Sequence, residues 1–153
     1  MARARNLKPQ FFHDAELLEC DFWVRLLFAG LWNYADARGI LADSVKQIKI
    51  DVFPADHVDI ESGLAELAHR GFILRYEVDG QRCLFIPAFR KHQSPHPKEP
   101  ENLLPAPTDS VEQLANNLQA TDEPQTPRLQ ASESTEEECK EEGRGKRETA
   151  RGG

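Results

Sequence analysis

Aromatic residues are missing from the last third of this sequence. All eight Phe, both Trp and both Tyr lie at or before Phe89. The charge is also uneven: residues 1 to 97 carry 12 Lys+Arg against 13 Asp+Glu, whereas residues 98 to 153 carry 7 against 13. A segment with high net charge, no aromatics and abundant Pro, Glu and Ser buries too little surface to offset its chain entropy. We therefore predict a folded domain over residues 1 to 97 and a disordered acidic tail over residues 98 to 153.

Cysteines are few and none has a partner at a CxxC spacing. The three thiols, Cys20, Cys83 and Cys139, are odd in number and scattered, which argues against a disulfide framework and a zinc site and favours a reducing compartment. His92 and His96 are four residues apart but flank Pro95, so they are not expected to share a helical face. The sequence predicts no bound metal and no cofactor.

Long apolar runs and catalytic motifs are also absent from the sequence. No run reaches the roughly 18 apolar residues of a membrane span, and no apolar stretch follows the basic start Met-Ala-Arg-Ala-Arg. The sequence has no glycine-rich phosphate loop, no G-x-S-x-G and no convincing carboxylate pair. We expect a cytoplasmic, non-enzymatic protein without a membrane partner.

Apolar residues at three- and four-residue steps predict three main helices. Asp14 can cap a short turn through Leu18, and Asp21 can cap a helix over 22 to about 37 that ends before a left-handed Gly39. A second helix over 45 to 53 follows Asp43 or Ser44, and a third, capped by Asp56 or Asp59, ends at Gly71. The face expected to be buried in the first main helix contains Trp23, Leu26, Leu27, Gly30, Leu31 and Tyr34.

A β-hairpin is predicted after the third helix. Residues 72 to 78 and 81 to 86 are rich in strand formers and flank Asp79-Gly80, the dipeptide that favours a two-residue type I′ turn. This turn pairs Val78 with Gln81, Glu77 with Arg82, Tyr76 with Cys83, Leu74 with Phe85 and Ile73 with Ile86. Residues 39 to 41 are long enough only for a short strand.

The order of these elements predicts an α+β fold. Helix, short strand, helix, tight turn, helix and hairpin is the order of a winged helix-turn-helix, with three helices and a two-stranded β-wing. In such a fold the third helix usually enters the major groove. Here that helix carries Asp59, Glu61 and Glu66, which repel phosphate.

Basic residues outside the third helix are the candidate DNA contacts. They lie in an N-terminal arm, on the second helix, on the wing and just after it: Arg3, Arg5, Lys8, Lys46, Lys49, Arg75, Arg82, Arg90, Lys91 and His92. An exposed pair such as Lys46 and Lys49 more often keeps a helix face solvated than it binds a ligand, and Arg82 is also consistent with an ion pair to Glu77 across the hairpin. If the arm and residues 90 to 92 lie side by side, they form one phosphate-binding strip.

Two segments at the ends of the predicted domain are distinctive, Arg5-Asn6-Leu7-Lys8-Pro9 and Lys91-His92-Gln93-Ser94-Pro95-His96. With Arg25-Leu26-Leu27-Phe28-Ala29-Gly30-Leu31-Trp32 and Ala35-Asp36-Ala37-Arg38-Gly39, they resemble the N-terminal domains of phage and prophage replication proteins of the replisome-organiser or replication-protein-O type. The resemblance covers about residues 1 to 97. It implies a winged-helix domain that binds DNA at a replication origin, with a helicase or its loader as a partner of the C-terminal part.

Two other functions remain open from the sequence. The acidic third helix favours a protein-interaction module that docks on a basic partner or on a second copy of itself, and a dimeric transcriptional regulator would use the same fold. In the tail, Val111, Leu114, Ala115 and Leu118 share one stripe of a possible short helix over about 110 to 119.

Overall fold

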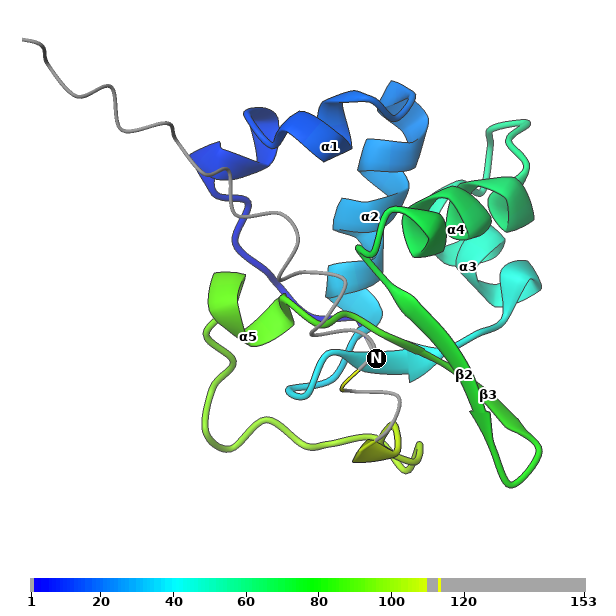
Figure 1. Ribbon diagram of the computed structural model, residues 1–153. Coiled ribbons are helices and arrows are strands. Elements are labelled where there is room, and N and C mark those ends of the chain that lie inside the picture. The colour runs from blue at the N-terminus through cyan, green and yellow to red at the C-terminus, as the bar shows by residue number, and fades with distance from the viewer. Residues whose placement is uncertain (1, 110–112, 114–153) are drawn as a thin grey trace, which may run out of the picture. The chain divides into compact units, whose positions relative to one another are not determined.

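The computed structural model describes residues 2 to 109 and residue 113 (Figure 1). This part of the chain contains five α-helices, one short 3-10 helix and one antiparallel sheet of three strands. The helices are α1 (Ala15–Leu18), α2 (Phe22–Tyr34), α3 (Val45–Val52), α4 (Ile60–His69) and α5 (Phe89–His92), with η1 at Pro9–Phe12. The strands are β1 (Ile40–Ala42), β2 (Leu74–Val78) and β3 (Gln81–Phe85). The arrangement is α+β and compatible with a winged-helix-like fold.

Helix starts follow the side chains that cap them. Asp14 accepts a hydrogen bond from the Leu17 N–H and begins α1, while Ser44 begins α3 and Asp59 begins α4 in the same way. Asp21 precedes α2 but makes no side-chain capping bond. α2 ends at Tyr34 and not near residue 37, because Ala35 is already extended.

Helix α2 is the centre of the core and packs against α3 and α4. The predicted face is confirmed in part: Leu27 and Leu31 are buried, and Trp23 and Tyr34 are partly buried against the core. Val24, Phe28 and Trp32, which were not assigned to that face, are buried as well. Leu26, which was expected inside, is 55% exposed. Apolar residues occupy nearly every side of this helix, so its periodicity alone does not select a face.

The hairpin has the predicted register from Val78↔Gln81 to Leu74↔Phe85. Asp79 and Gly80 both have positive φ, as a type I′ turn requires. The ladder stops there, and the Ile86 N–H donates to the Gly39 carbonyl instead of extending the pairing to Ile73. The sheet is not two-stranded, because β1 pairs with β3 on the side away from β2.

The packed structure continues beyond Pro97. Residues 99 to 107, which we call the strap, lie against the domain, although the sequence predicted them to belong to a disordered tail. Tyr76 Oη donates to the Pro105 carbonyl at 2.7 Å, and Pro107 is buried. The possible helix over 110 to 119 and the acidic run of the tail lie outside the described residues.

A buried carboxylate holds the strap against the turn after α2. Asp36 is completely buried, and its oxygens accept hydrogen bonds from the backbone of Arg38, Ile40 and Asn102 and from the Arg38 guanidinium. The Asn102 amide in turn donates to the Ile40 carbonyl at 2.9 Å. Each charged or polar group buried here has a partner, as a stable interior requires.

Candidate nucleic-acid interface

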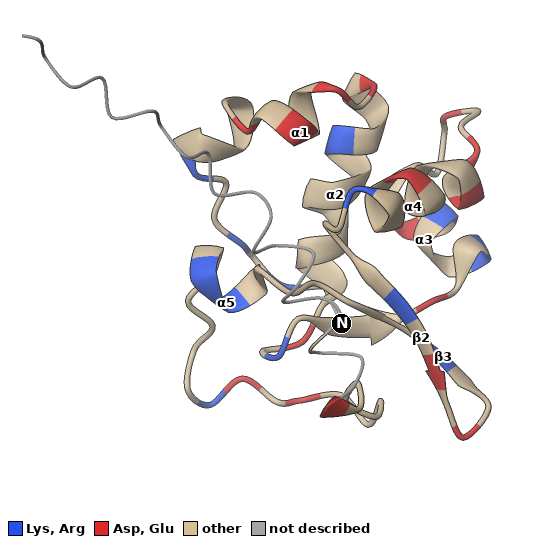
Figure 2. Cartoon of the chain, in the orientation of Figure 1, with Lys and Arg blue, Asp and Glu red and all other residues tan. Residues whose placement is uncertain are grey.

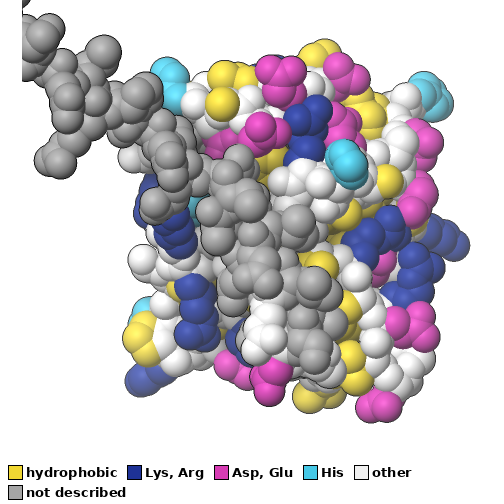
Figure 3. All heavy atoms as spheres, in the orientation of Figure 1, with side chains coloured by type: hydrophobic (Ala, Val, Ile, Leu, Met, Phe, Trp, Pro, Cys, Tyr) yellow, Lys and Arg dark blue, Asp and Glu magenta, His cyan; other side chains and the backbone are white. Residues whose placement is uncertain are grey.

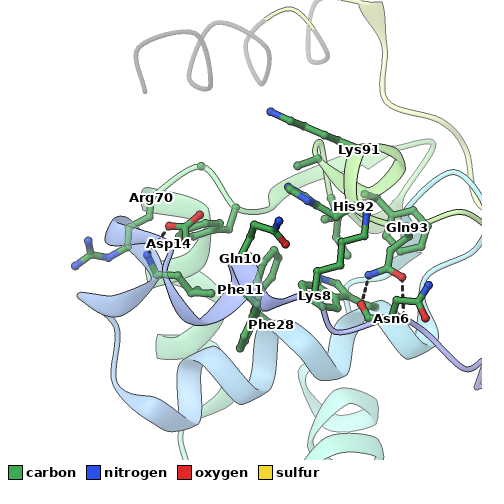
Figure 4. Close-up of a pocket in the computed structure, with 17 residues that line it drawn as sticks. Asn6, Lys8, Gln10, Phe11, Asp14, Phe28, Arg70, Lys91, His92 and Gln93 are labelled. Atoms are coloured by element: carbon green, nitrogen blue, oxygen red, sulfur yellow. Dashed lines mark hydrogen bonds between the residues drawn. The ribbon is translucent and has the colours of Figure 1, made fainter. Parts of the chain in front are cut away.

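The N-terminal arm is joined to the segment that follows α5. The Asn6 N–H donates to Gln93 Oε1 at 2.9 Å, and Gln93 Nε2 donates to the Asn6 carbonyl at 2.7 Å (Figure 4). Gln93 is 4% exposed, so these two bonds hold its buried amide and fix the arm in place. The side-by-side placement that we predicted for the two segments is therefore confirmed.

This junction brings together basic side chains that are more than 80 residues apart in the sequence. Lys8 follows Asn6 by two residues, and Lys91 and His92 come directly before Gln93. All three side chains lie at one end of the same cavity (Figure 4). Lys8 and Lys91 are exposed, and the side chain of neither makes a hydrogen bond or ion pair to any residue in the described part of the chain. The charges of both lysines act on His92, which also lines the cavity.

The pKa of His92 is shifted by this crowding of positive charge. Burial lowers the pKa of the imidazole below its ordinary value, and the charges of Lys91 and Lys8 lower it further, against a smaller opposing effect of Asp14. An anion bound between the lysines would reverse the effect of their charge.

Aromatic side chains form the floor of the cavity, which has a volume of about 280 Å³. Phe28 and Trp32 of α2 are in edge-to-face contact at 5.2 Å, and Trp32 contacts Phe11 in the same way at 5.5 Å. Phe72 lies beside Phe28 at 5.2 Å, and Phe11 and Phe72 remain partly exposed. The charged Asp14 and Arg70 lie at the other end, away from Lys8 and Lys91 (Figure 4).

Arg3 and Arg5 of the predicted site are engaged within the domain. Arg5 has a side chain that is only 6% exposed and forms a two-point ion pair with Glu99, at 2.9 and 2.5 Å. Its remaining donors reach the carbonyls of Trp32 and Ala35. Arg3 also pairs with Glu99, at 3.2 Å, and donates to the Pro100 carbonyl. Both guanidinium groups bind the strap.

The wing arginines lie among carboxylates. Arg75 pairs with Asp43 at 2.8 Å and with Glu61 at 2.6 Å. The bond to Glu61 is the main cause of a raised Arg75 pKa, and the same bond lowers the pKa of Glu61. Arg82 is 58% exposed and lies 3.5 Å from Asp43, so its nearest acid is not Glu77, its partner across the hairpin.

Lys46, Lys49 and Arg90 differ in whether their side chains are hydrogen-bonded within the domain. Lys46 is exposed, whereas Lys49 donates to the Asp56 carbonyl. Arg90 is exposed on α5 and donates to the Ala37 carbonyl at 3.3 Å. Within the described residues, the predicted basic groups therefore separate into one set at the arm and α5 and another at α3 and the hairpin (Figure 2).

The two sets differ in the charges around them. Acidic residues lie on α4 and on the loops at the α3 side (Figure 2). Two of them are in ion pairs, Glu61 with Arg75 and Glu66 with Arg70. On the face shown in Figure 3, basic side chains at the α5 side form a group of their own, while those at the hairpin side are interspersed with acidic ones. Among the described residues, Lys8 and Lys91 at the α5 side therefore offer an anion positive charge that no ion pair engages.

Other reactive groups in the described part of the chain offer no second site. Cys20 and Cys83 are buried free thiols, and burial raises the pKa of Cys20 to about 11 and that of Cys83 above its usual value. Among these residues there is no group of three His, Cys, Asp or Glu placed to hold a metal ion, and no helix that could cross a membrane.

Two features of the site escaped the reading of the sequence. One is Gln93, which was part of a matched segment but had no role assigned to it. The other is Glu99, whose position in a polar, proline-containing stretch gives no periodic signal. The local signal for the strap contacts is Asp36. The side chain of an Asp often accepts a hydrogen bond from the backbone N–H two residues later, which forms an Asx turn.

Comparison of the chain with protein-family models, with curated proteins and with solved structures found no match.

Proposed function

We propose that this chain is a DNA-binding protein that contacts the phosphate backbone through Lys8, Arg90, Lys91 and His92, which we call the α5 strip. The observation that carries the proposal is the Asn6–Gln93 junction, which joins the segment of Lys8 to the segment of Lys91, so that both lysines line one cavity and neither side chain has an acidic partner among the described residues. Lysine groups that neutralise phosphates release condensed counterions, and this release supplies most of the affinity for DNA that does not depend on sequence.

The α5 strip contains only four of the ten basic residues that the sequence suggested as DNA contacts. Arg3 and Arg5 are committed to Glu99 and backbone carbonyls, and Arg75 to Asp43 and Glu61. Helix α4 has Glu61 and Glu66 on its surface, so it makes a poor major-groove reader. Lys46 and Arg82 remain secondary candidates at the other side of the domain.

The biological setting that we propose is DNA replication initiation in a phage or prophage. It rests on the resemblance of the Arg5–Pro9 and Lys91–His96 segments to replication proteins. The protein would act in the cytoplasm of the bacterial host, bind at an origin and recruit a helicase or its loader. It would have no catalytic activity of its own.

The proposal is tested by fluorescence anisotropy with the full chain and labelled duplex and single-stranded DNA at several salt concentrations. The variant Lys8→Ala/Lys91→Ala removes two charges from the α5 strip, and Lys46→Ala/Arg82→Ala removes two from the other side. We expect the first to lower the affinity at least about tenfold and to reduce the salt slope by roughly 0.9 per lost duplex phosphate contact. Equal effects of both variants, or no binding by the folded wild type at low salt, would contradict the proposal.

Exposed apolar side chains support a second candidate function, a protein-interaction module. Leu18, Phe22 and Leu26 are 48%, 76% and 55% exposed, and the last two are one turn apart on α2. Apolar exposure of this kind marks an interaction surface when it is contiguous. This candidate predicts self-association in sedimentation velocity that Phe22→Ser/Leu26→Ser abolishes; a monomer at every concentration would exclude self-association as the function.

A further inference from the structure

The cavity beside the α5 strip has the properties of a site for a ligand with one planar ring and one negatively charged group attached to it. Its floor is aromatic, its volume of about 280 Å³ is close to the lower end for small-molecule sites, and its two lysines, Lys8 and Lys91, line it away from Asp14 and Arg70. A docked helix would need an elongated groove with several anchor positions along it. A single ring and one phosphate fit the observed dimensions and charges better.

The lining residues match the chemistry of a nucleotide. Phe11 and Phe72 are partly exposed and offer ring surface on which a base can stack. Gln10 is exposed at the cavity and makes no side-chain hydrogen bond to another described residue, so its amide is free to pair with the edge of a base. Lys8 and Lys91 also line the cavity and supply positive charge for the attached phosphate.

We infer that the cavity takes an unpaired base of single-stranded DNA while the lysines at its rim hold the neighbouring phosphate. The inference rests on the proposed function and deepens it, because it names the form of DNA that the site prefers. A base inside a duplex cannot reach the cavity without leaving the stack, which costs a few kcal/mol. The protein should therefore favour single strands, unpaired ends and melted segments over intact duplex.

The test compares two single-stranded oligonucleotides with the same number of phosphates, one of thymidines and one of abasic sites. The full chain is used as the variant Trp23→Phe, in which Trp32 at the cavity floor is the sole remaining tryptophan of the two. Stacking of one base is worth about 1–3 kcal/mol, so the thymidine strand should bind roughly 5- to 150-fold more tightly than the abasic strand. It alone should change the emission of Trp32.

Phe11 and Phe12 provide a matched pair of variants. Phe11 lines the cavity, whereas Phe12 is 56% exposed and does not. Phe11→Ala should lower the ratio of the two affinities toward one, while Phe12→Ala should leave the ratio unchanged. The ratio is insensitive to partial unfolding, because loss of folded protein weakens both complexes equally.

The possible failures are distinguishable. Equal affinities for the two strands, with Trp32 emission unaffected by either, would overturn the base-binding inference and leave phosphate binding by the α5 strip intact. Absence of binding to both strands by the folded protein would overturn the proposed function and the inference together.

Discussion

Arg5 and Glu99 form a two-point ion pair between residues that are 94 positions apart in the sequence. The side chains of both are at most 10% exposed. Arg5 also lies over the ring of Phe89, with its guanidinium carbon 5.0 Å from the ring centre. An arginine of the arm thereby fastens the strap to the domain, next to α5.

Truncation after Pro97 is expected to destabilise the domain. It would leave the buried Arg5 guanidinium without its carboxylate and remove the Asn102 contacts of Asp36, and the loss of one partner of a buried ion pair typically costs about 3–5 kcal/mol. A chain that ends after residue 109 keeps these contacts. Urea unfolding of the two truncated chains beside the full chain measures the difference; equal stability of all three would show that the strap contributes nothing.

Glu99→Gln should produce a pH-dependent loss of stability. The hydrogen bond from Arg5 is the main cause of a pKa of Glu99 below its ordinary value. A carboxyl whose pKa is lowered in the folded state contributes stability above its unfolded pKa, and this contribution disappears as the pH falls through the folded pKa. We expect wild type to exceed the variant by about 2 kcal/mol at pH 7 and the gap to close toward pH 3.

If urea unfolding showed a gap that stayed constant from pH 7 to pH 3, the ion pair would not be the source of the difference. Glu101→Gln provides the control, because Glu101 is 56% exposed and lies 3.5 Å from Arg38. Its effect should be below about 1 kcal/mol, as for other exposed pairs.

Gln93→Ala should loosen the arm and weaken DNA binding although Gln93 carries no charge. The substitution removes both bonds to the Asn6 backbone, and each such hydrogen bond contributes about 0.5–1.5 kcal/mol net. Hydrogen exchange of the Asn6 amide and anisotropy titration measure the two effects. Gln10→Ala, at an exposed glutamine, should leave the Asn6 exchange rate unchanged; a protected Asn6 amide in Gln93→Ala would contradict the role of the junction.

DNA affinity should increase as the pH falls below 7. Burial and the charges of Lys91 and Lys8 lower the pKa of His92 in the free protein, with Asp14 acting weakly in the opposite sense. A bound phosphate raises that pKa, so binding takes up a proton and gains strength at lower pH. His92→Gln should flatten the dependence measured by anisotropy between pH 5.5 and 8. An equally steep dependence in the variant would assign it to another group.

The sequence was sufficient for those parts of the fold that local chemistry determines. The capping residues Asp14, Ser44 and Asp59 and the Asp79-Gly80 turn act within a few residues of themselves, and the helix starts and hairpin register follow from them. The pairing of β1 with β3 is a long-range contact and was not predicted. The buried face of α2 was predicted correctly at Leu27 and Leu31 and wrongly at Leu26, because residues on the exposed side of the helix are as apolar as those in the core.

The sequence suggested which segments of the candidate site are adjacent. It did not indicate which basic side chains of the site are free and which are in ion pairs. The sequence suggested that the arm and residues 90 to 92 are adjacent, and the Asn6–Gln93 bonds confirm it. The state of each basic group depends on tertiary partners: Arg5 and Lys8 are three residues apart, yet one is buried against Glu99 and the other is free. Composition cannot distinguish a structural arginine from one available to a ligand.

The most direct test of DNA contact at the α5 strip is lysine acetylation of the unmutated full chain, with and without saturating single-stranded DNA, quantified by mass spectrometry. Lys8 and Lys91 should lose reactivity severalfold when DNA is bound, because their ammonium groups contact phosphate, while the exposed Lys46 should react as before. Protection of Lys46 with Lys8 and Lys91 still reactive would place the DNA on the other side of the domain and contradict the proposal.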